Sequence, residues 1–335
     1  MTVHTHYYDI KSDTPREMGL ALGHAFGGAL KPFLSQLKPL PDKTRAYLAD
    51  CLALTRQHFP DYVEELEGYA AGAGVDAAML WQMLLEDDIN ALQTEKCTSM
   101  VTNDGRLIGH NEDWSADAAR RLFILRRTLR GRTLFELHYA GTLGGNALSI
   151  NSSGMVQMIN SLEGMPFDAG EPRVPTNIIG RFIAEAIDTA AALKKLNAIP
   201  RMGGYAHTLI HAHGAGNQLL ELSQDRIAAR NISQFPFVHA NHYTLDDMLH
   251  CNRRPPAESE SSRQRYAGAS EGITAAMTPQ QLMALLENDS KGPDNSLYNR
   301  RTIAGVAIDL DAKCAWIRLA SEPEQDWVKY GLDFI

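Results

Sequence analysis

A change of residue pattern at Cys97 most constrains how this chain can fold. Before it, four stretches place apolar residues at helical spacing: REMGLALGHAFGGALKPFLSQL, DKTRAYLADCLALTRQHF, PDYVEELEGYAAGAG and VDAAMLWQMLLEDDI. Pro60 suits the first turn of the third stretch, and Asp76 is expected to cap the fourth. After it, the segments are short, β-rich and separated by Gly, Asn or Asp. We therefore expect a helical segment, residues 1–96, and a β-rich segment, residues 97–335.

The second segment alternates predicted strands with two predicted helices. Strands are expected at CTSMVT, RLIGHN, TLFELHYAG, ALSINSS and GMVQMIN, followed by a helix over Thr176–Leu196. Further strands are expected at YAHTLIHAH, NQLLELS, FPFVHAN, TIAGVAIDL and AKCAWIRLA. A helix at TPQQLMALLEN has a capping box of Thr278 with Gln281. This order predicts an α+β fold, with helices packed on a mainly antiparallel β core in one compact domain.

Composition excludes several classes of protein. The 335 residues carry a formal net charge of −8 and no long basic run, so no nucleic-acid partner is expected. No apolar run approaches the roughly 20 residues that cross a bilayer, and no secretory signal is visible, so we expect a cytoplasmic protein without a membrane partner. Four widely spaced cysteines form no CxxC pair, which argues against a disulfide framework or a zinc site.

The sequence NDG, residues 103–105, predicts a tight hairpin turn directly after Cys97. With Asp104 and Gly105 as the two loop residues, position 97 faces position 112. Cys97 then lies beside Glu112 and Asp113 at the open end of the hairpin. Carboxylates oppose ionisation of a thiol, but they suit a protonated amine. If the chain were cut before Cys97, its new α-amine would supply such a group and serve as the base for its own thiol.

A simpler interpretation stays open on spacing alone. A lone cysteine is most often a small buried hydrophobe. Asp113 can cap a turn, and Asn241 can begin a loop. His207, His211 and His213 in HTLIHAH resemble a metal cluster, because the three share one face of a strand, but no cysteine or carboxylate completes the set. We expect no metal and no cofactor.

Several motifs together resemble a known family. They are EKCTSM, GHNEDW, YAGTLGGNALSINSSGM, INSL, VHANHY and SSRQR, in that order along nearly the whole chain. The sequence resembles the acyl-CoA:6-aminopenicillanate acyltransferase-like family, peptidase family C45, a branch of the N-terminal nucleophile hydrolases. The resemblance implies a four-layer αββα sandwich. It also implies a precursor that cuts itself between Lys96 and Cys97, with segments 1–96 and 97–335 staying associated.

The resemblance also assigns roles to individual residues. Cys97 would be the nucleophile, and Asp113 in NEDW would orient its α-amine. Asn241 in VHANHY would be the oxyanion-hole asparagine. Arg301 in YNRRTIAG would be the active-site arginine, although Arg300 is adjacent. Asn151 and Asn160 lie in family-like motifs and can equally fix turns. Lys96 departs from the small residue expected before the nucleophile.

The expected reaction is cleavage of a small N-acyl or aminoacyl amide through a Cys97 thioester. Water or an amine could take the acyl group, so an acyltransferase using an acyl-CoA or amide donor remains the alternative. A second alternative is an unprocessed relative that only binds a ligand. Hydrolysis is favoured because transfer requires a second amine held in place. The expected partner is a small-molecule amide substrate, and the sequence is compatible with a homo-oligomer.

Overall fold

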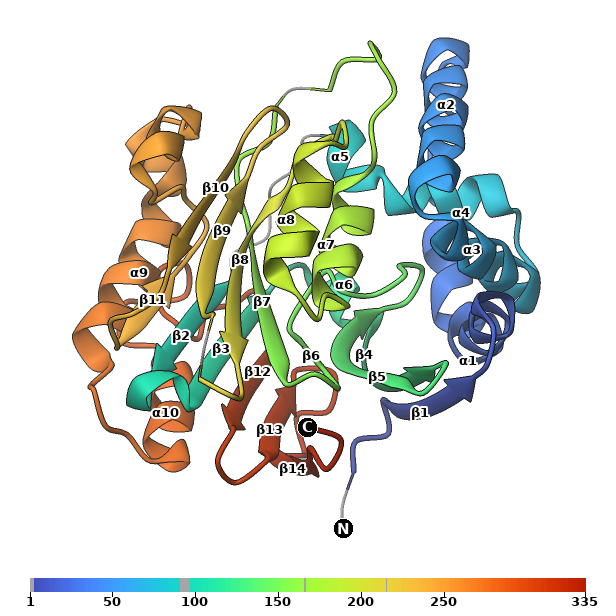
Figure 1. The fold of residues 1–335 in the computed structure, drawn as a ribbon. Coiled ribbons are helices and arrows are strands. Elements are labelled where there is room, and N and C mark those ends of the chain that lie inside the picture. The colour runs from blue at the N-terminus through green and yellow to red at the C-terminus, as the bar shows by residue number, and fades with distance from the viewer. Residues whose placement is uncertain (1–2, 91–96, 166, 215) are drawn as a thin grey trace.

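Two β-sheets packed face to face form the centre of the molecule, shown in a computed structural model that describes residues 3–90, 97–165, 167–214 and 216–335 (Figure 1). One sheet has eight strands in the order β1-β4-β5-β6-β7-β8-β9-β10. The other has six, in the order β11-β2-β3-β12-β13-β14. Helices cover the outer face of each sheet, so the layers run αββα (Figure 1). The predicted fold class is confirmed.

The strands of the eight-stranded sheet are β1 (Tyr7–Ser12), β4 (Leu122–Leu129), β5 (Arg132–Tyr139), β6 (Ser149–Asn151), β7 (Met155–Ser161), β8 (Tyr205–His211), β9 (Gln218–Leu222) and β10 (Ile227–Asn231). Those of the six-stranded sheet are β11 (Phe237–His239), β2 (Thr98–Thr102), β3 (Leu107–Asp113), β12 (Thr302–Asp309), β13 (Cys314–Leu319) and β14 (Val328–Gly331). All neighbouring strands are antiparallel except β1 and β4, which are parallel.

The helices are α1 (Pro15–Leu34), α2 (Asp42–His58), α3 (Pro60–Ala73), α4 (Ala77–Leu84), α5 (Glu86–Asn90), α6 (Ala116–Ala119), α7 (Thr176–Ala184), α8 (Thr189–Asn197), α9 (Glu260–Gly272) and α10 (Pro279–Leu286). Short 3₁₀ turns are η1 (Asn103–Gly105), η2 (Asp246–Cys251) and η3 (Pro256–Ser259). Within the described residues, none of these helices is both long and apolar enough to cross a membrane.

Some predicted elements need correction. Residues 1–96 are not wholly helical, because β1 adds an edge strand to the eight-stranded sheet. The helix expected over Thr176–Leu196 is two helices, since the Asp188 side chain caps α8 by accepting from the N–H groups of Ala190 and Ala191. The fourth predicted helix is likewise divided into α4 and α5. The expected Asp76 cap and the capping box of α10 are confirmed.

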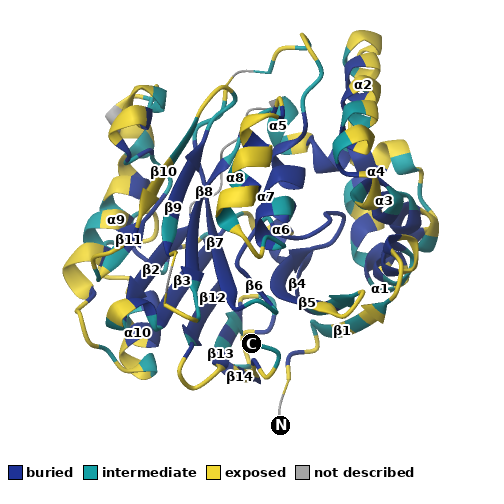
Figure 2. Cartoon of the chain, in the orientation of Figure 1, coloured by how far each residue is buried: buried dark blue, intermediate teal, exposed yellow. Residues whose placement is uncertain are grey.

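Three apolar cores hold the layers together. The first lies between the sheets, where Val101 and Ile108 of the hairpin meet residues such as Ile150 and Val156. The second lies between the eight-stranded sheet and helices α1–α4 and α7. The third lies between the six-stranded sheet and helices α9 and α10. Both sheets are accordingly buried along most of their length, whereas the outer faces of the helices are exposed (Figure 2).

Glycines let helices α1 and α3 touch backbone to backbone. A Cβ added at Gly19 of α1 would lie 2.0 Å from the Glu65 carbonyl oxygen, and one at Gly68 of α3 would lie 2.3 Å from the Arg16 carbonyl oxygen. Neither position can hold a side chain without moving a helix. On the far side of α3, the buried Glu65 carboxylate accepts a hydrogen bond from Arg127 Nη2 of β4 at 2.6 Å. The helices before Cys97 are therefore fixed to the strands after it.

Candidate active site

Cys97 lies directly before β2, at one end of the sandwich, and its side chain is 2% exposed. The hairpin that follows has the predicted register, with Thr102 opposite Leu107 and Thr98 opposite Asn111. Its turn is also as predicted, because the Arg106 N–H donates to the Asn103 carbonyl around two residues of positive φ. Position 97 is therefore opposite position 112. Lys96 lies outside the described residues.

Strand alternation divides the hairpin's side chains between two environments. Val101 and Ile108 point into the core between the sheets, while Met100 and Leu107 point toward α9 and α10. Because successive side chains alternate, position 97 shares the inner face with positions 110 and 112, and position 113 belongs to the outer face. Of the two carboxylates expected near Cys97, Glu112 is the one on its own face of the hairpin.

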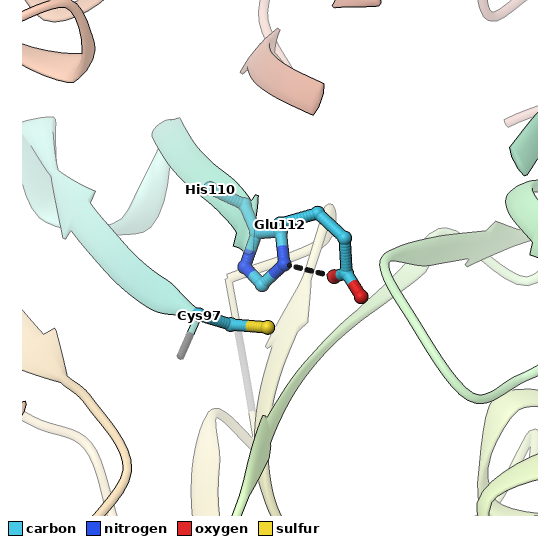
Figure 3. Close-up of side chains that lie close together, drawn as sticks. All are labelled: Cys97, His110 and Glu112. Atoms are coloured by element: carbon cyan, nitrogen blue, oxygen red, sulfur yellow. Dashed lines mark hydrogen bonds and ion pairs between the residues drawn. The ribbon is translucent and has the colours of Figure 1, made fainter. Parts of the chain in front are cut away.

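Cys97, His110 and Glu112 form a compact buried group (Figure 3). The sulfur, a ring nitrogen and a carboxylate oxygen all lie within 4.8 Å of one another. His110 Nε2 is 2.9 Å from Glu112 Oε2, and the Tyr139 hydroxyl donates to Glu112 Oε1 at 2.7 Å. These donor types could share an ion, but the imidazole and carboxylate atoms already share a hydrogen bond. We therefore treat the group as an acid–base group.

The Cys97 carbonyl oxygen accepts two side-chain hydrogen bonds. Asn160 Nδ2, near the end of β7, donates at 2.9 Å, and Arg265 Nη1 of α9 donates at 2.7 Å. The same Arg265 nitrogen donates to Thr98 Oγ1 at 2.6 Å. Arg265 is fully buried, and burial lowers its pKa while Asp113 raises it. A buried cation thus lies within hydrogen-bond reach of the backbone at Cys97.

Asp113 is fully buried at the end of β3. Its Oδ2 accepts a hydrogen bond from Asn299 Nδ2 at 2.8 Å. Burial raises the pKa of this carboxyl from 3.8 to about 6, and the positive charge of Arg265 limits the rise. Asp113 therefore changes ionisation close to the pH at which many enzymes work.

The structure connects Asn241 to the same group. Asn241 Oδ1 accepts from Arg265 Nη2 at 2.8 Å, and its Nδ2 donates to the Ser161 carbonyl at 2.9 Å. Arg301 is half-buried, and its carbonyl accepts from the Trp114 N–H at 2.8 Å, which ties β12 to the end of β3. Burial lowers the pKa of Arg265, and the positive charge of Arg301 lowers it further. Arg265 thus contacts Cys97 and Asn241, and the charges of Asp113 and Arg301 act on its pKa.

Arg265 was not assigned a role from the sequence, although its motif SSRQR was part of the resemblance. For Asn160, the sequence indicates only a family-like motif and a residue that can fix a turn. His110 lies inside GHNEDW, but no pattern in that motif indicates that its ring turns toward Cys97. Asn299 lies in YNRRTIAG, the motif that contains Arg301, but nothing in that motif indicates its contact with Asp113. The signal for Arg265 and Asn160 was therefore their motif, and their contacts with Cys97 depend on the folded chain.

The three histidines of HTLIHAH do not form such a group in the part of the chain that the structure describes. His207 is fully buried, and its Nδ1 lies 3.2 Å from Gln157 Oε1. Burial lowers its pKa to about 3, so it is neutral at ordinary pH. His239 and His242, which flank Asn241 in the sequence, contact Glu221 and Ser262 respectively.

A cavity of about 600 Å³ is lined by residues that follow β7 and β9 and by residues that precede β8. Asn160, which contacts the Cys97 carbonyl, lies near the same end of β7. The Tyr243 hydroxyl on its wall donates to the Glu163 carbonyl at 3.1 Å, two residues beyond the Ser161 that Asn241 contacts. The wall carries both charges and apolar groups, from Glu163, Met165, Ser223, Asp225, Arg226, Tyr243, His250, Cys251 and Arg253.

Comparison with known proteins adds a family and several relatives. Residues 100–324 match the family described as "Acyl-coenzyme A:6-aminopenicillanic acid acyl-transferase". A curated relative, the beta-alanyl-dopamine/carcinine hydrolase of Drosophila melanogaster, is 27% identical over an alignment of 214 residues, and the match covers 55% of this chain and 55% of the relative. The chain therefore spans about half the length of that relative.

Solved structures with a similar arrangement include penicillin V acylase from Agrobacterium tumefaciens, at 12% identity and a TM-score of 0.41, covering 67% of this chain and 83% of that one. Another is a mutant of the conjugated bile acid hydrolase from Clostridium perfringens, at 10% identity and a TM-score of 0.36, covering 72% and 93%. The family match spans more than half of the chain. The chain belongs to the acyl-coenzyme A:6-aminopenicillanic acid acyl-transferase family.

Proposed function

We propose that this family member is a self-processing cysteine amidohydrolase. It cuts its own chain between Lys96 and Cys97, and the new N-terminal cysteine then cleaves the amide bond of a small N-acyl or aminoacyl amine. The observation that carries the proposal is the buried group around Cys97, in which Arg265 and Asn160 hold its carbonyl oxygen and the charge of Asp113 raises the pKa of Arg265. A cysteine that served only as core packing would not need a buried cation beside it.

Self-cleavage begins when the Cys97 thiol attacks the carbonyl carbon of the preceding peptide bond. A carbon–sulfur bond forms, the carbon–nitrogen bond breaks, and the nitrogen becomes the α-amine of Cys97. Water then hydrolyses the thioester and returns the thiol. In the cut enzyme, the α-amine takes the proton from the thiol during attack on a substrate amide. Asp113 holds and orients that amine, because its carboxylate attracts the protonated form of the amine.

Negative charge develops on the carbonyl oxygen during each attack, and nearby donors stabilise it. We assign this role to Asn241, supported by the Arg265 cation that binds its Oδ1. An amide nitrogen carries two hydrogens, so Asn241 can hold the Ser161 carbonyl with one and offer the other to the substrate. Arg301 adds positive charge at the edge of the group, as its effect on Arg265 indicates.

A small amide of a compact amine is the substrate class that we favour. The curated relative is a hydrolase of beta-alanyl-dopamine and carcinine by its name. The cavity of about 600 Å³, whose wall includes Glu163 and Tyr243, has room for a molecule of that size. Its mixed polar and apolar wall suits a substrate with an aromatic or heterocyclic part and a polar chain.

The two segments would stay associated after the cut. Strand β1 from the first segment pairs with β4 from the second, and both segments contribute to the core over the eight-stranded sheet. The buried Glu65–Arg127 pair also joins them. Separation would expose this apolar surface to water and break the ion pair, and the loss of apolar burial is strongly unfavourable. The fragments should elute together in native buffer and separate in denaturant.

The cytoplasm is the compartment that we favour. None of the four cysteines, all of which lie in described residues, takes part in a disulfide. Thiols stay reduced in the cytosol, whereas cysteine pairs in secreted proteins are commonly oxidised. Cell fractionation with an antibody would test this placement, and recovery in the extracellular fraction would contradict it.

A panel of N-acyl and β-alanyl amides, assayed for amine release by the wild-type chain and by Cys97→Ala, tests the proposed reaction. Release by the wild type alone supports it, and equal release by both proteins contradicts it. Acyl transfer is the second candidate, favoured by the description of the family. It would show as a product that forms only when an amine acceptor is added.

A further inference from the structure

The uncut chain needs a base that the cut enzyme does not. Before cleavage, the nitrogen of Cys97 belongs to a peptide bond and cannot accept the thiol proton. The self-cleavage step proposed above therefore requires another acceptor near the sulfur. Asp113 belongs to the outer face of the hairpin, where it contacts Asn299. Among the described histidines and carboxylates, His110 and Glu112 of the inner face lie beside the sulfur, and the Tyr139 hydroxyl contacts Glu112.

We propose that His110, paired with Glu112, takes the proton from the Cys97 thiol and so activates it before the chain is cut. This inference rests on the proposed function for its role in processing. The imidazole, the carboxylate and the sulfur are all buried and lie within 4.8 Å of one another (Figure 3). The proton passes directly or through one bridging water.

Hydrogen bonds on the other side of the ring fix which nitrogen can accept. Asn160 donates from Nδ2 to the Cys97 carbonyl, so its Oδ1 is the acceptor for the Ser99 hydroxyl at 2.8 Å. The Ser99 oxygen then accepts from His110 Nδ1, 3.1 Å away. With its hydrogen on Nδ1, neutral His110 presents an unprotonated Nε2 to Glu112.

Nε2 and Glu112 Oε2 are 2.9 Å apart, so a proton must lie between these two acceptors to make their contact favourable. Tyr139 already donates to the other carboxylate oxygen and cannot supply it without losing that bond. The thiol of Cys97 is the adjacent source. Transfer leaves a thiolate beside an imidazolium–carboxylate pair, and the net charge of the three groups together does not change.

The step then balances in atoms and charge. The thiolate attacks the carbonyl carbon of the preceding peptide bond and forms the carbon–sulfur bond. The carbon–nitrogen bond breaks, and the nitrogen takes the proton back from the His110–Glu112 pair. The pair is thus restored, and the α-amine is free to serve as the base in later turnovers.

The first experiment follows self-cleavage of freshly purified chains by intact mass. His110→Gln should slow cleavage by about 100-fold or more, the range of general acid–base effects, and Glu112→Gln should slow it less. The matched control is His138→Gln, which alters another buried histidine–carboxylate pair, with Glu136 at 3.3 Å, away from Cys97. Thermal melting confirms that each variant is folded. Cleavage of His110→Gln at the control's rate would overturn the inference.

The second experiment does not depend on cleavage. The rate at which methyl methanethiosulfonate modifies Cys97 is measured against pH in the uncut chain only. Peptides that contain the intact bond between residues 96 and 97 report this rate by mass, because cut chains do not yield them. Removal of the base should move the His110→Gln profile about one pH unit or more to higher pH, relative to wild type and His138→Gln. Superimposed profiles would overturn the inference. If the wild-type chain stays uncut but the His110→Gln profile is shifted, self-processing is refuted, whereas the role of His110 as the base for Cys97 is supported.

Discussion

Asp113→Asn should make the protein more stable at neutral pH while removing its activity. Burial raises the pKa of this carboxyl from 3.8 to about 6, so its ionised form is disfavoured by about two pH units in the folded state. At about 1.4 kcal/mol per unit, wild-type protein loses about 3 kcal/mol of unfolding free energy when Asp113 ionises. The attraction of Arg265 is already part of this shift.

The direction of the Asp113 pKa shift determines at which pH the stability of the variant differs from that of the wild type. Because the folded-state pKa lies above the unfolded one, the folded protein binds more protons between about pH 4 and 6, and wild-type stability falls as the pH rises through that window. Asparagine keeps a hydrogen-bond acceptor for Asn299 and carries no charge. The variant should therefore match wild type below about pH 4 and exceed it above about pH 6.

Urea unfolding between about pH 4 and 8 measures this difference. Both chains should carry Cys97→Ala, so that neither is cut and the same species unfolds in each case. A gap of about 3 kcal/mol at pH 8 that closes by pH 4 would agree with the pKa shift. A variant less stable at pH 8, or a gap independent of pH, would refute the reasoning. With Cys97 present, Asp113→Asn should lose most of its amide turnover, and the remaining turnover should show no acid limb near pH 6.

Particular contacts give three further predictions. Arg265→Gln should lower turnover and self-cleavage by about 100-fold or more in timed assays, and Arg301→Gln should lower them less. A larger loss in Arg301→Gln would show that Arg301, and not Arg265, is the cation that supports the reaction. Gly68→Ala should lower the unfolding free energy by about 1–3 kcal/mol, because its Cβ would meet the Arg16 carbonyl, whereas Gly28→Ala has open space and should not. Ser223→Tyr should raise KM through the cavity without slowing self-cleavage; an unchanged KM would place the substrate elsewhere.

The local features near Cys97 were predictable from the sequence. Asn103, Asp104 and Gly105 all adopt positive φ, which few other residues tolerate, so the turn and its register were determined by three neighbouring residues. The helices before Cys97 were predicted for a similar reason, since their apolar spacing is regular. The division of Thr176–Leu196 was missed because the pattern continues across Asp188.

The rest of the site depends on contacts that no local pattern encodes. Arg265 reaches Cys97 across 168 residues of sequence, from helix α9, whose composition is mostly polar and lacks an apolar stripe. Asn160 arrives from the other sheet and His110 from a strand position that any residue could occupy. The family motif indicated that some of these residues matter, but the folded chain is needed to assign their partners.

Intact mass and N-terminal sequencing of purified wild-type protein test the central claim most directly. The account predicts two chains, residues 1–96 and 97–335, with the second beginning Cys-Thr-Ser. Cys97→Ala should remain whole under the same conditions. A wild-type chain that stays whole yet cleaves amides, or one cut at another bond, would contradict it.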